Sequence, residues 1–546
     1  MKLSRFVFGA SLAVLLCSLT PRAQDMSQHQ HDMGEKLGRV NFAVSCNAAA
    51  QQQFNRAVAL LHSFWYDEAA RGFGDVTKSD PKCGMAYWGV AMSFYHPVWT
   101  PPVPAELRSG SAAALEAKRV GARTQRERDY IAAIETFYQN ADKLDHRTRA
   151  LAYEKVMEQL HLRYPKDDEA AVFYSLSLLG TALPTDKTYS NQKKAAGILN
   201  RVLVSEPDHP GVAHYLIHSF DYPSLAELAL PAARSYAKIA PSSPHALHMP
   251  SHIFTRLGLW QESIESNLAS AAAARNYTAK MYPGATSYNQ LHALDYLVYA
   301  YLQTAQDGKA KEIVDAVLAM NKVDAYAQAA AYAFAAIPAR YALERRQWSE
   351  AAALKVHPAN FPWNDFSYTK AMIYFARSLG ASRIGDTVSA KKDLEQLTAI
   401  QKSLADAGDK YWATQVEIER LAASAWLGNA ESKQEQALKL MRSAADLEDS
   451  TEKHPVTPGA IVPARELLGE LLLELREPQL ALPEFEASLL VSPNRFNGLF
   501  GAARAAELSG DRSKARTLYA NLTALAEHSD GTRPELQAAR VFLSSK

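Results

Sequence analysis

The sequence predicts an all-α protein built from pairs of antiparallel helices. Three observations predict this class. Stretches rich in Ala, Leu, Glu, Lys and Gln carry apolar residues at spacings of three and four, alternating runs of β-branched residues are absent, and Pro or Gly separates the helical stretches. A chain of 546 residues exceeds the ~250–300 residues that one hydrophobic core accommodates. Several domains or one elongated array of helices are therefore expected.

The N-terminus has the layout of a secretory signal peptide over residues 1–23. Two positive charges precede an apolar run over residues 6–19, and a polar stretch follows Ala23. The run is shorter than the ~20 residues that span a bilayer, so we expect cleavage near Ala23 and no transmembrane segment in the mature chain. Export to the periplasm or the extracellular space follows from this interpretation. Cys17 follows Leu16 and not a small residue, which leaves a lipid anchor as an alternative.

A polar tail is expected over residues 24–45. It contains His29, His31 and Met33, and imidazole and sulfur ligands together suit copper in an exported protein. The same residues also fit a disordered tail in which the histidines are incidental. Both interpretations stay open.

One spacing recurs along the rest of the chain. A small residue precedes a proline by twelve positions at Ala69 and Pro81, Ala195 and Pro207, Ala229 and Pro241, and Ala481 and Pro493. Other pairs are 34 residues apart, namely Pro207 and Pro241, Ala481 and Ala515, and Phe485 and Tyr519. Helical stretches such as 114–140, 147–163 and 391–407 lie between the breakers. A 34-residue unit therefore governs distant parts of the chain.

This period, with small residues where helices cross and a proline closing each unit, resembles the tetratricopeptide repeat of exported bacterial proteins. The resemblance implies antiparallel helix pairs stacked into a right-handed superhelical solenoid, whose concave groove is lined by the first helix of each unit. We expect N-terminal units over 46–99, linking helices over 100–189, central units over 190–320, diverged helical repeats over 321–460 and C-terminal units over 461–546.

The mature chain keeps two cysteines, Cys46 and Cys83. Disulfides persist in the oxidising compartments to which exported proteins are sent. In a tetratricopeptide-like unit, Cys46 precedes the first helix and Cys83 follows the second, and antiparallel helices place these ends side by side. We expect the two cysteines to pair, with two buried free thiols as the alternative. Closing this loop stabilises the first unit by about 3 to 4 kcal/mol in the chain-entropy description.

Histidines follow the same period in the central units. His214 and His218 are followed 34 residues later by His248 and His252. The spacing of four within each pair puts both imidazoles on one helical face. Four imidazole nitrogens are enough for zinc or copper, with Asp221 as an oxygen ligand or as the residue that orients a histidine. Asp295 is a second candidate for that role.

Two other interpretations use the same histidines. They bind a peptide or another ligand in the groove, or they pack against neighbouring helices with satisfied nitrogens. The resemblance also places a set of polar residues on the groove wall: His62, His96, Asp221, Arg256, His292, Asp295 and Tyr299.

Pro250 lies between His248 and His252 and removes one backbone donor. The helix therefore either kinks or begins there. If it begins there, the two imidazoles need not share a face.

No motif in the sequence assigns a reaction, and no catalytic residue is predicted. Tyr215 and Met249 stand where a hydrolytic zinc helix carries its glutamate, and no phosphate loop or serine elbow is found. With 59 Lys and Arg against 58 Asp and Glu, the chain has no basic field for nucleic acid. We predict an exported scaffold that binds a peptide or protein partner in its groove. The alternative is a metal-binding protein or metal-dependent enzyme that uses His214, His218, His248 and His252.

Overall fold

A computed structural model describes residues 35–98, 100–531 and 533–545. Helices are the regular elements of this part of the chain, which otherwise holds a single isolated β-bridge between Thr286 and Val323. The predicted all-α class is therefore confirmed. The predicted signal peptide and the candidate ligands His29, His31 and Met33 lie outside the described residues. No helix in the described part is both long and apolar enough to cross a membrane.

The N-terminal helices begin at polar caps and end at breakers. Asn47 caps the first helix by accepting a hydrogen bond from the backbone N–H of Ala50. The stretch 114–140 forms two helices, because Gly121 ends one of them at a positive φ of 72° and Thr124 caps the next. The helices are α1 (Ala48–His62), α2 (Tyr66–Ser79), α3 (Gly84–Met92), α4 (Pro104–Val120), α5 (Gln125–Tyr138), α6 (His146–Arg163), α7 (Asp168–Thr181) and α8 (Ser190–Ser205).

The central helices include the histidine repeat. Pro250 interrupts the hydrogen bonding between two short helices, but Met249 between them keeps helical dihedral angles of φ −53° and ψ −35°. The two helices therefore follow one helical path. The elements are α9 (Pro210–Phe220), the 3-10 helix η1 (Ala226–Ala229), α10 (Leu230–Ile239), α11 (Pro244–His248), α12 (Pro250–Arg256), α13 (Trp260–Met281), α14 (Tyr288–Gln303), α15 (Asp307–Ala319), α16 (Gln328–Glu344) and α17 (Trp348–Ala352).

The C-terminal helices continue the pairing, and short turns join most of them. Gly510 turns the chain at a φ of 84°, and the Asp511 side chain then caps the next helix. A longer connection, the 450–463 segment, precedes α22. The helices are α18 (Ser367–Arg383), α19 (Thr387–Asp406), α20 (Lys410–Ala430), α21 (Gln434–Asp449), α22 (Ala464–Glu474), α23 (Pro478–Val491), α24 (Phe496–Leu508), α25 (Arg512–Leu525) and α26 (Pro534–Ser544).

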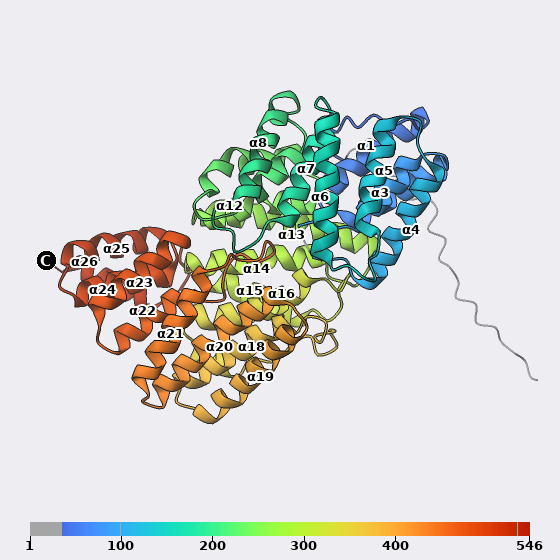
Figure 1. The fold of residues 1–546 in the computed structure, drawn as a ribbon. Helices are drawn as coiled ribbons and strands as arrows, with labels where there is room; N and C mark the ends of the chain where they lie inside the picture. The colour runs from blue at the N-terminus through green and yellow to red at the C-terminus, as the bar shows by residue number, and fades with distance from the viewer. Residues whose placement is uncertain (1–34, 99, 532, 546) are drawn as a thin grey trace, which may run out of the picture. The chain divides into compact units, whose positions relative to one another are not determined.

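Consecutive helices pack against each other from α1 to α26. Figure 1 shows this arrangement most clearly in the C-terminal helices α22 to α26. The small residues that mark the 34-residue period are fully buried at these crossings: Ala69, Ala195, Ala229, Ala481 and Ala515. The same contact recurs in distant units, because Gly89 packs on the Phe73 ring and Gly501 packs on the Phe485 ring. A methyl group at either glycine would collide with the ring. The period therefore marks positions of close helix contact.

Residues 36–45 pack on the helices instead of forming a polar tail. Leu37, Val40 and Phe42 are buried, and the Phe42 ring lies 5.5 Å from the Trp88 ring. The prediction of a polar tail is therefore wrong for these ten residues. Burial of these apolar side chains holds the segment on the N-terminal helices, while the polar residues between them stay exposed.

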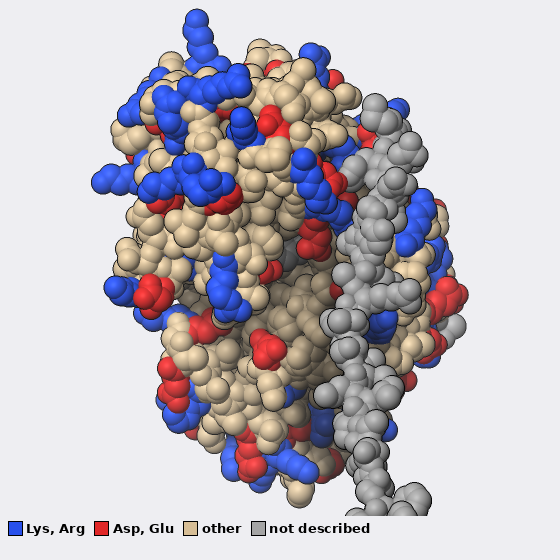
Figure 2. Space-filling view, turned by 90° about the vertical axis from the view of Figure 1, so that its right-hand side faces the viewer, with Lys and Arg blue, Asp and Glu red and all other residues tan. Residues whose placement is uncertain are grey.

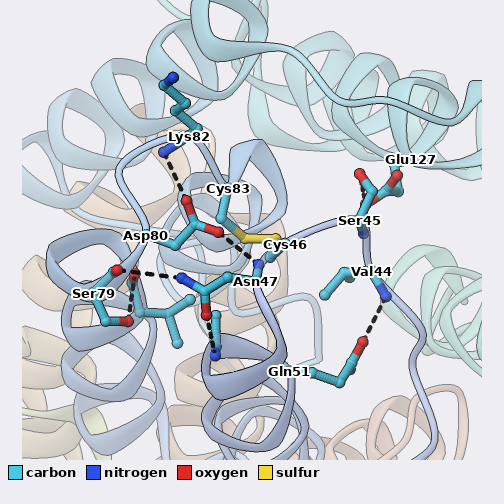
Figure 3. Close-up of a disulfide and its surroundings, with 12 residues drawn as sticks. Val44, Ser45, Cys46, Asn47, Gln51, Ser79, Asp80, Lys82, Cys83 and Glu127 are labelled. Atoms are coloured by element: carbon cyan, nitrogen blue, oxygen red, sulfur yellow. Dashed lines mark hydrogen bonds between the residues drawn. A yellow bond between two sulfur atoms is a disulfide. The ribbon is translucent and has the colours of Figure 1, made fainter.

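Cys46 and Cys83 form a disulfide with a Cα–Cα distance of 5.0 Å (Figure 3). Asn47, the residue after Cys46, donates its backbone N–H to the Asp80 side chain at 2.7 Å. The disulfide therefore joins the start of α1 to the turn between α2 and α3. The predicted pairing is confirmed.

Charged side chains of both signs are interspersed on the face drawn in Figure 2. This distribution agrees with the formal net charge of +1 for the whole chain. No uniformly positive surface covers that face.

Candidate metal centre

Eight of the 16 histidines are buried where α1, α9, α11, α12 and α14 pack together. Their exposed fractions lie between 0% and 6%. Histidine is ordinarily only partly buried, so such a concentration requires partners for many ring nitrogens. The eight are His62, His209, His214, His218, His245, His248, His252 and His292.

The first histidine cluster consists of His214, His218 and His245, and one nitrogen from each ring lies within 4.8 Å of the others. The Nδ1 atom of His214 lies 2.6 Å from the carbonyl oxygen of His62, which only accepts hydrogen bonds. Nδ1 therefore carries the proton, and Nε2 of His214 presents a lone pair to Nε2 of His245 at 3.2 Å. Nε2 of His218 is buried and has no hydrogen-bond partner among the described residues.

The second histidine cluster consists of His248, His252 and His292, again with one nitrogen from each ring within 4.8 Å of the others. Nδ1 of His248 lies 2.6 Å from Oδ1 of Asn267. The orientation of this amide is set, because its Nδ2 donates to the carbonyl oxygen of Ser263 at 2.7 Å. Nδ1 of His248 is therefore the donor, and its Nε2 has the lone pair.

Asp221 orients His252 in the same way. Its Oδ2 atom accepts a hydrogen bond from Nδ1 of His252 at 3.0 Å. Lys453 donates to the same oxygen at 2.8 Å, and Arg256 donates to the other oxygen at 2.9 Å. Although burial opposes ionisation, the charges of Lys453 and Arg256 hold the pKa of Asp221 well below its usual range. An ionised carboxylate only accepts, so Nε2 of His252 also has a lone pair.

The two Nε2 atoms of His248 and His252 face each other at 3.0 Å. Burial lowers the pKa of both imidazoles, so both rings are neutral at pH 7. Two lone pairs at this distance repel each other unless a cation lies between them. Two nitrogens bound to one tetrahedral ion at about 2.0–2.1 Å are separated by about 3.3 Å. The arrangement is therefore close to that of two ligands of one metal ion.

Tyr296 adds an oxygen beside the second histidine cluster. Its hydroxyl lies 3.3 Å from Nε2 of His252 and donates to the carbonyl oxygen of Thr457 at 3.0 Å. Burial raises the pKa of Tyr296 well above its usual value, so the phenol is neutral. Tyr296 lies one helical turn after His292 on α14, and the 450–463 segment holds its hydroxyl in place.

A third group, the histidine–glutamate cluster, is fully hydrogen-bonded. His62 and His209 each donate from Nε2 to one oxygen of Glu169, at 2.9 and 3.1 Å. Nδ1 of His62 accepts from the Tyr215 hydroxyl at 2.9 Å, and Nδ1 of His209 accepts from the Val212 N–H at 3.3 Å. Every ring nitrogen in this cluster therefore has a protein partner. No lone pair is left for a metal ion.

The four histidines predicted as metal ligands divide between the two histidine clusters. His214 and His218 lie in the first, His248 and His252 lie in the second, and the continuous path through Pro250 keeps the latter two together. Asp221 lies behind His252 and orients its ring. Its carboxylate is not one of the groups that lie within 4.8 Å of one another in the second histidine cluster.

The predicted groove residues lie in several different environments. His292 joins the second histidine cluster, and His62 joins the histidine–glutamate cluster. Asp295 pairs with Arg340 at 2.5 Å. All of these side chains except His96 are at most 8% exposed, and two of them, Arg256 and Tyr299, line a partly open cavity.

Two further groove residues lie outside the clusters. Tyr299 accepts a hydrogen bond from Arg495 at 2.8 Å, and His96 donates to the carbonyl oxygen of Ser93 at 2.9 Å. The Phe64 ring helps to close the histidine region, since it contacts the His214 ring at a centroid distance of 4.3 Å.

Sequence reasoning missed His245 as a ligand candidate, and it missed the roles of Asn267, Tyr296 and Lys453. A signal for His245 is visible, because His245, His248 and His252 are spaced by three and four along one helical path. The other three residues lie outside the histidine repeat. No spacing in the sequence connects them to it.

No protein-family model matches the chain, and no curated protein matches it. A search of solved structures finds matches at low identity. The Cut9–Hcn1 hetero-tetramer of APC/C matches at 13% identity over 90% of this chain and 83% of that chain, with a TM-score of 0.35. Human IFIT1, as a dimer with m7Gppp-AAAA, matches at 12% identity over 81% of this chain and 90% of that chain, with a TM-score of 0.34.

Both neighbours are tetratricopeptide-repeat proteins, the family that the 34-residue period resembles. At these TM-scores the matches carry no conclusion about this protein. Its fold class follows from its own helices and their packing.

Proposed function

We propose that this protein binds two transition-metal ions, zinc or copper, one in each histidine cluster. The observation that carries the proposal is the 3.0 Å approach of Nε2 of His248 to Nε2 of His252. Asn267 and Asp221 accept hydrogen bonds from the Nδ1 atoms of His248 and His252, so the protons of these rings lie on Nδ1. A metal ion between the inward nitrogens replaces a repulsion with two coordinate bonds.

The ligand types support this choice of metal. Neutral imidazole suits zinc and copper, whereas calcium and magnesium prefer oxygen ligands. Hydrogen bonds from the outer ring nitrogens to a carboxylate, an amide and a backbone carbonyl are typical of metal-binding histidines, because they set the tautomer and raise ligand basicity. An ion held by three imidazoles keeps a free position for a water molecule or another small ligand.

The two clusters are neighbours. The His218 and His252 rings have centroids 6.0 Å apart, as do the His245 and His248 rings. Two ions bound in these clusters therefore share one buried compartment.

Metal analysis of the purified chain tests the proposal. We expect about two equivalents of zinc or copper after loading and desalting. His252→Ala removes the ion of the second cluster, and His214→Ala removes the ion of the first, so each leaves about one equivalent. His209→Ala is the matched control, since it changes a buried histidine of the hydrogen-bonded cluster and leaves the content at two. Less than about a tenth of an equivalent in the loaded wild-type protein would falsify the proposal.

Export is part of the proposal, and it is supported by the composition of residues 1–23. Fractionation of the native host is expected to place the mature chain in the periplasm or the medium. Recovery of the full-length chain in the cytoplasm contradicts this location.

A protein-interaction scaffold is the second candidate function. It is favoured by the stacked helix pairs and by a partly open cavity of 430 Å³, into which aromatic side chains of α18 and α20 project. Partner recovery with the wild-type chain and with Trp412→Ala tests it. Equal recovery with both proteins counts against this cavity as the partner site.

A further inference from the structure

The 430 Å³ cavity lies beyond the histidine clusters, between α18, α20 and the 450–463 segment. This volume is typical of sites for small organic ligands. One wall is aromatic. The Tyr368 and Trp412 rings are stacked at a centroid distance of 4.1 Å and an angle of 15°, and the His454 ring stacks on Trp412 at 5.2 Å. Tyr411 lies beside Trp412 in the same wall.

The polar side of the cavity has atoms without a hydrogen-bond partner among the described residues. Gln415 and Glu419 lie one turn apart on the face of α20 that lines the cavity. Nε2 of Gln415, Oε2 of Glu419 and Oγ of Ser488 are buried, and none has a hydrogen-bond partner in the described part of the chain. Ser488 itself is only 5% exposed. Buried polar atoms of native proteins are nearly always paired with protein, water or ligand atoms, so these three atoms are available to a ligand in the cavity.

The cationic side chains of the cavity are already paired. Lys187 bonds Glu452 at 2.7 Å, and Lys453 bonds Asp221 at 2.8 Å. Glu419, in contrast, has no ion pair among the described residues. Burial, with a smaller contribution from the charge of Glu448, raises the pKa of Glu419 to about 8. The cavity therefore contains a carboxyl group that lacks a counter-ion.

Glu448 lines the same cavity. Its Oε2 atom accepts a hydrogen bond from the backbone N–H of Ala464 at 2.8 Å. Burial raises its pKa to about 7. Two carboxyl groups that form no ion pair among the described residues thus line the same cavity as the aromatic wall.

We propose that this cavity binds a small organic cation, with an ammonium group that pairs with Glu419 and alkyl groups that contact the Trp412, Tyr368 and Tyr411 rings. A cation over the face of an aromatic ring is attracted by the ring quadrupole. Glu419 supplies the counter-charge in its ionised form, which the bound ammonium group favours over the protonated form. Nε2 of Gln415, which donates, and Oγ of Ser488, which donates or accepts, are left for the remaining polar groups of the ligand.

A series of hydrogen bonds connects the cavity with the second histidine cluster. Lys453 lines the cavity and bonds Asp221, and Asp221 in turn bonds His252. None of the residues that would hold the cation is a metal ligand. Cation binding therefore goes beyond the metal proposal, and it is expected in both the metal-free and the metal-loaded chain.

Calorimetric titration of the full chain tests the inference, with choline and its uncharged analogue 3,3-dimethylbutan-1-ol as probes. We expect choline to bind at least about tenfold more tightly than the analogue. Glu419→Gln is expected to weaken choline binding about tenfold or more and to leave binding of the analogue unchanged. Trp412→Ala weakens both. Glu417→Gln is the matched control, because Glu417 lies on the same helix, pairs with Arg420 and does not line the cavity.

Three results overturn the inference. The first is equal affinity for choline and its uncharged analogue. The second is an unchanged affinity for choline in Glu419→Gln, with circular dichroism showing that the variant is folded. The third is binding of a neutral disaccharide such as cellobiose in place of either probe, which assigns the cavity to sugars. Removal of metal by a chelator is the separate arm that tells failure of this inference from failure of the metal proposal.

Discussion

The histidine–glutamate cluster and the second histidine cluster contain the same kinds of residue at the same depth, but their ring nitrogens have opposite environments. In the histidine–glutamate cluster, Glu169 lies between His62 and His209 and accepts a hydrogen bond from each. In the second histidine cluster, Asp221 lies behind His252, so the inward nitrogens of His252 and His248 face each other. The position of the carboxylate therefore decides whether the inward ring nitrogens donate hydrogen bonds or carry lone pairs that face each other.

The comparison shows why a count of histidines does not identify a metal site. Both clusters satisfy the spacing that metal ligands require. What separates them is the tautomer that each outer hydrogen bond imposes. Variants that move or remove one acceptor are consequently the sharpest tests of the difference.

Glu169→Ala is expected to have the largest effect on stability. It leaves two buried Nε2–H groups without an acceptor, which costs about 3–5 kcal/mol of the free energy of unfolding. Metal content is expected to stay at two equivalents. Denaturant unfolding at pH 7 and metal analysis of the same sample measure the two quantities. A parallel loss of metal shows that the histidine–glutamate cluster is a metal site too.

The pH dependence of this effect has a definite sign. Although burial opposes ionisation, His62 and His209 lower the pKa of Glu169 below its usual value. A lowered pKa contributes stability that is present above the unfolded value of about 4.3 and is lost as the pH falls through the folded value. The difference between wild type and Glu169→Ala should therefore shrink in acid. A difference that grows in acid contradicts the assigned ionisation.

Metal removal is expected to lower stability by about 3 kcal/mol for each ion at a metal concentration of ~100 times the dissociation constant. The reason is that the ion binds the folded chain and releases the repulsion between His248 and His252. Thermal unfolding with and without a chelator measures this effect. The double variant His214→Ala with His252→Ala should no longer respond to the chelator. An undiminished response in this variant places the metal elsewhere.

Asp221→Asn is expected to have a smaller effect, a loss of about 10–100-fold in affinity for the ion of the second cluster. The amide is a weaker acceptor for Nδ1 of His252, so the ring is less firmly oriented and less basic. Competition titration against a chromophoric chelator measures both sites. The first histidine cluster is the internal control, and an equal loss at both sites indicates a general disturbance of the fold.

Glu419→Gln is expected to produce the smallest change, a gain in stability on the order of 1 kcal/mol after allowance for its partial exposure. Burial raises the folded pKa to about 8, against about 4.3 in the unfolded chain. Stability of the wild type therefore falls as the pH rises between these values, and the gain should be complete above pH ~8 and absent below pH ~4. Unfolding curves across this range test the sign. A constant difference at all pH values contradicts it.

Much of the candidate site was predictable, and the limit has a physical origin. The spacing of four within the pairs at His214 and His248 places imidazoles on one helical face in any α-helix. The outer partners of these rings are different. His62 lies 152 residues from His214, and Asn267 lies 19 residues from His248. Such contacts depend on how helices pack, and the histidine period does not encode them.

The sequence by itself determined the helical class, the 34-residue period and the small residues that are buried at the crossings. These follow from local propensity, from breakers and from short connections, so they depend on residues close along the chain. The tertiary structure alone decided that His292 joins the second histidine cluster. It also decided that Glu169 accepts hydrogen bonds from the inward nitrogens of the histidine–glutamate cluster, whereas Asp221 bonds only the outer nitrogen of His252. Those outcomes depend on which side chain fills a space between helices distant in sequence, and packing geometry settles this at the scale of single hydrogen bonds.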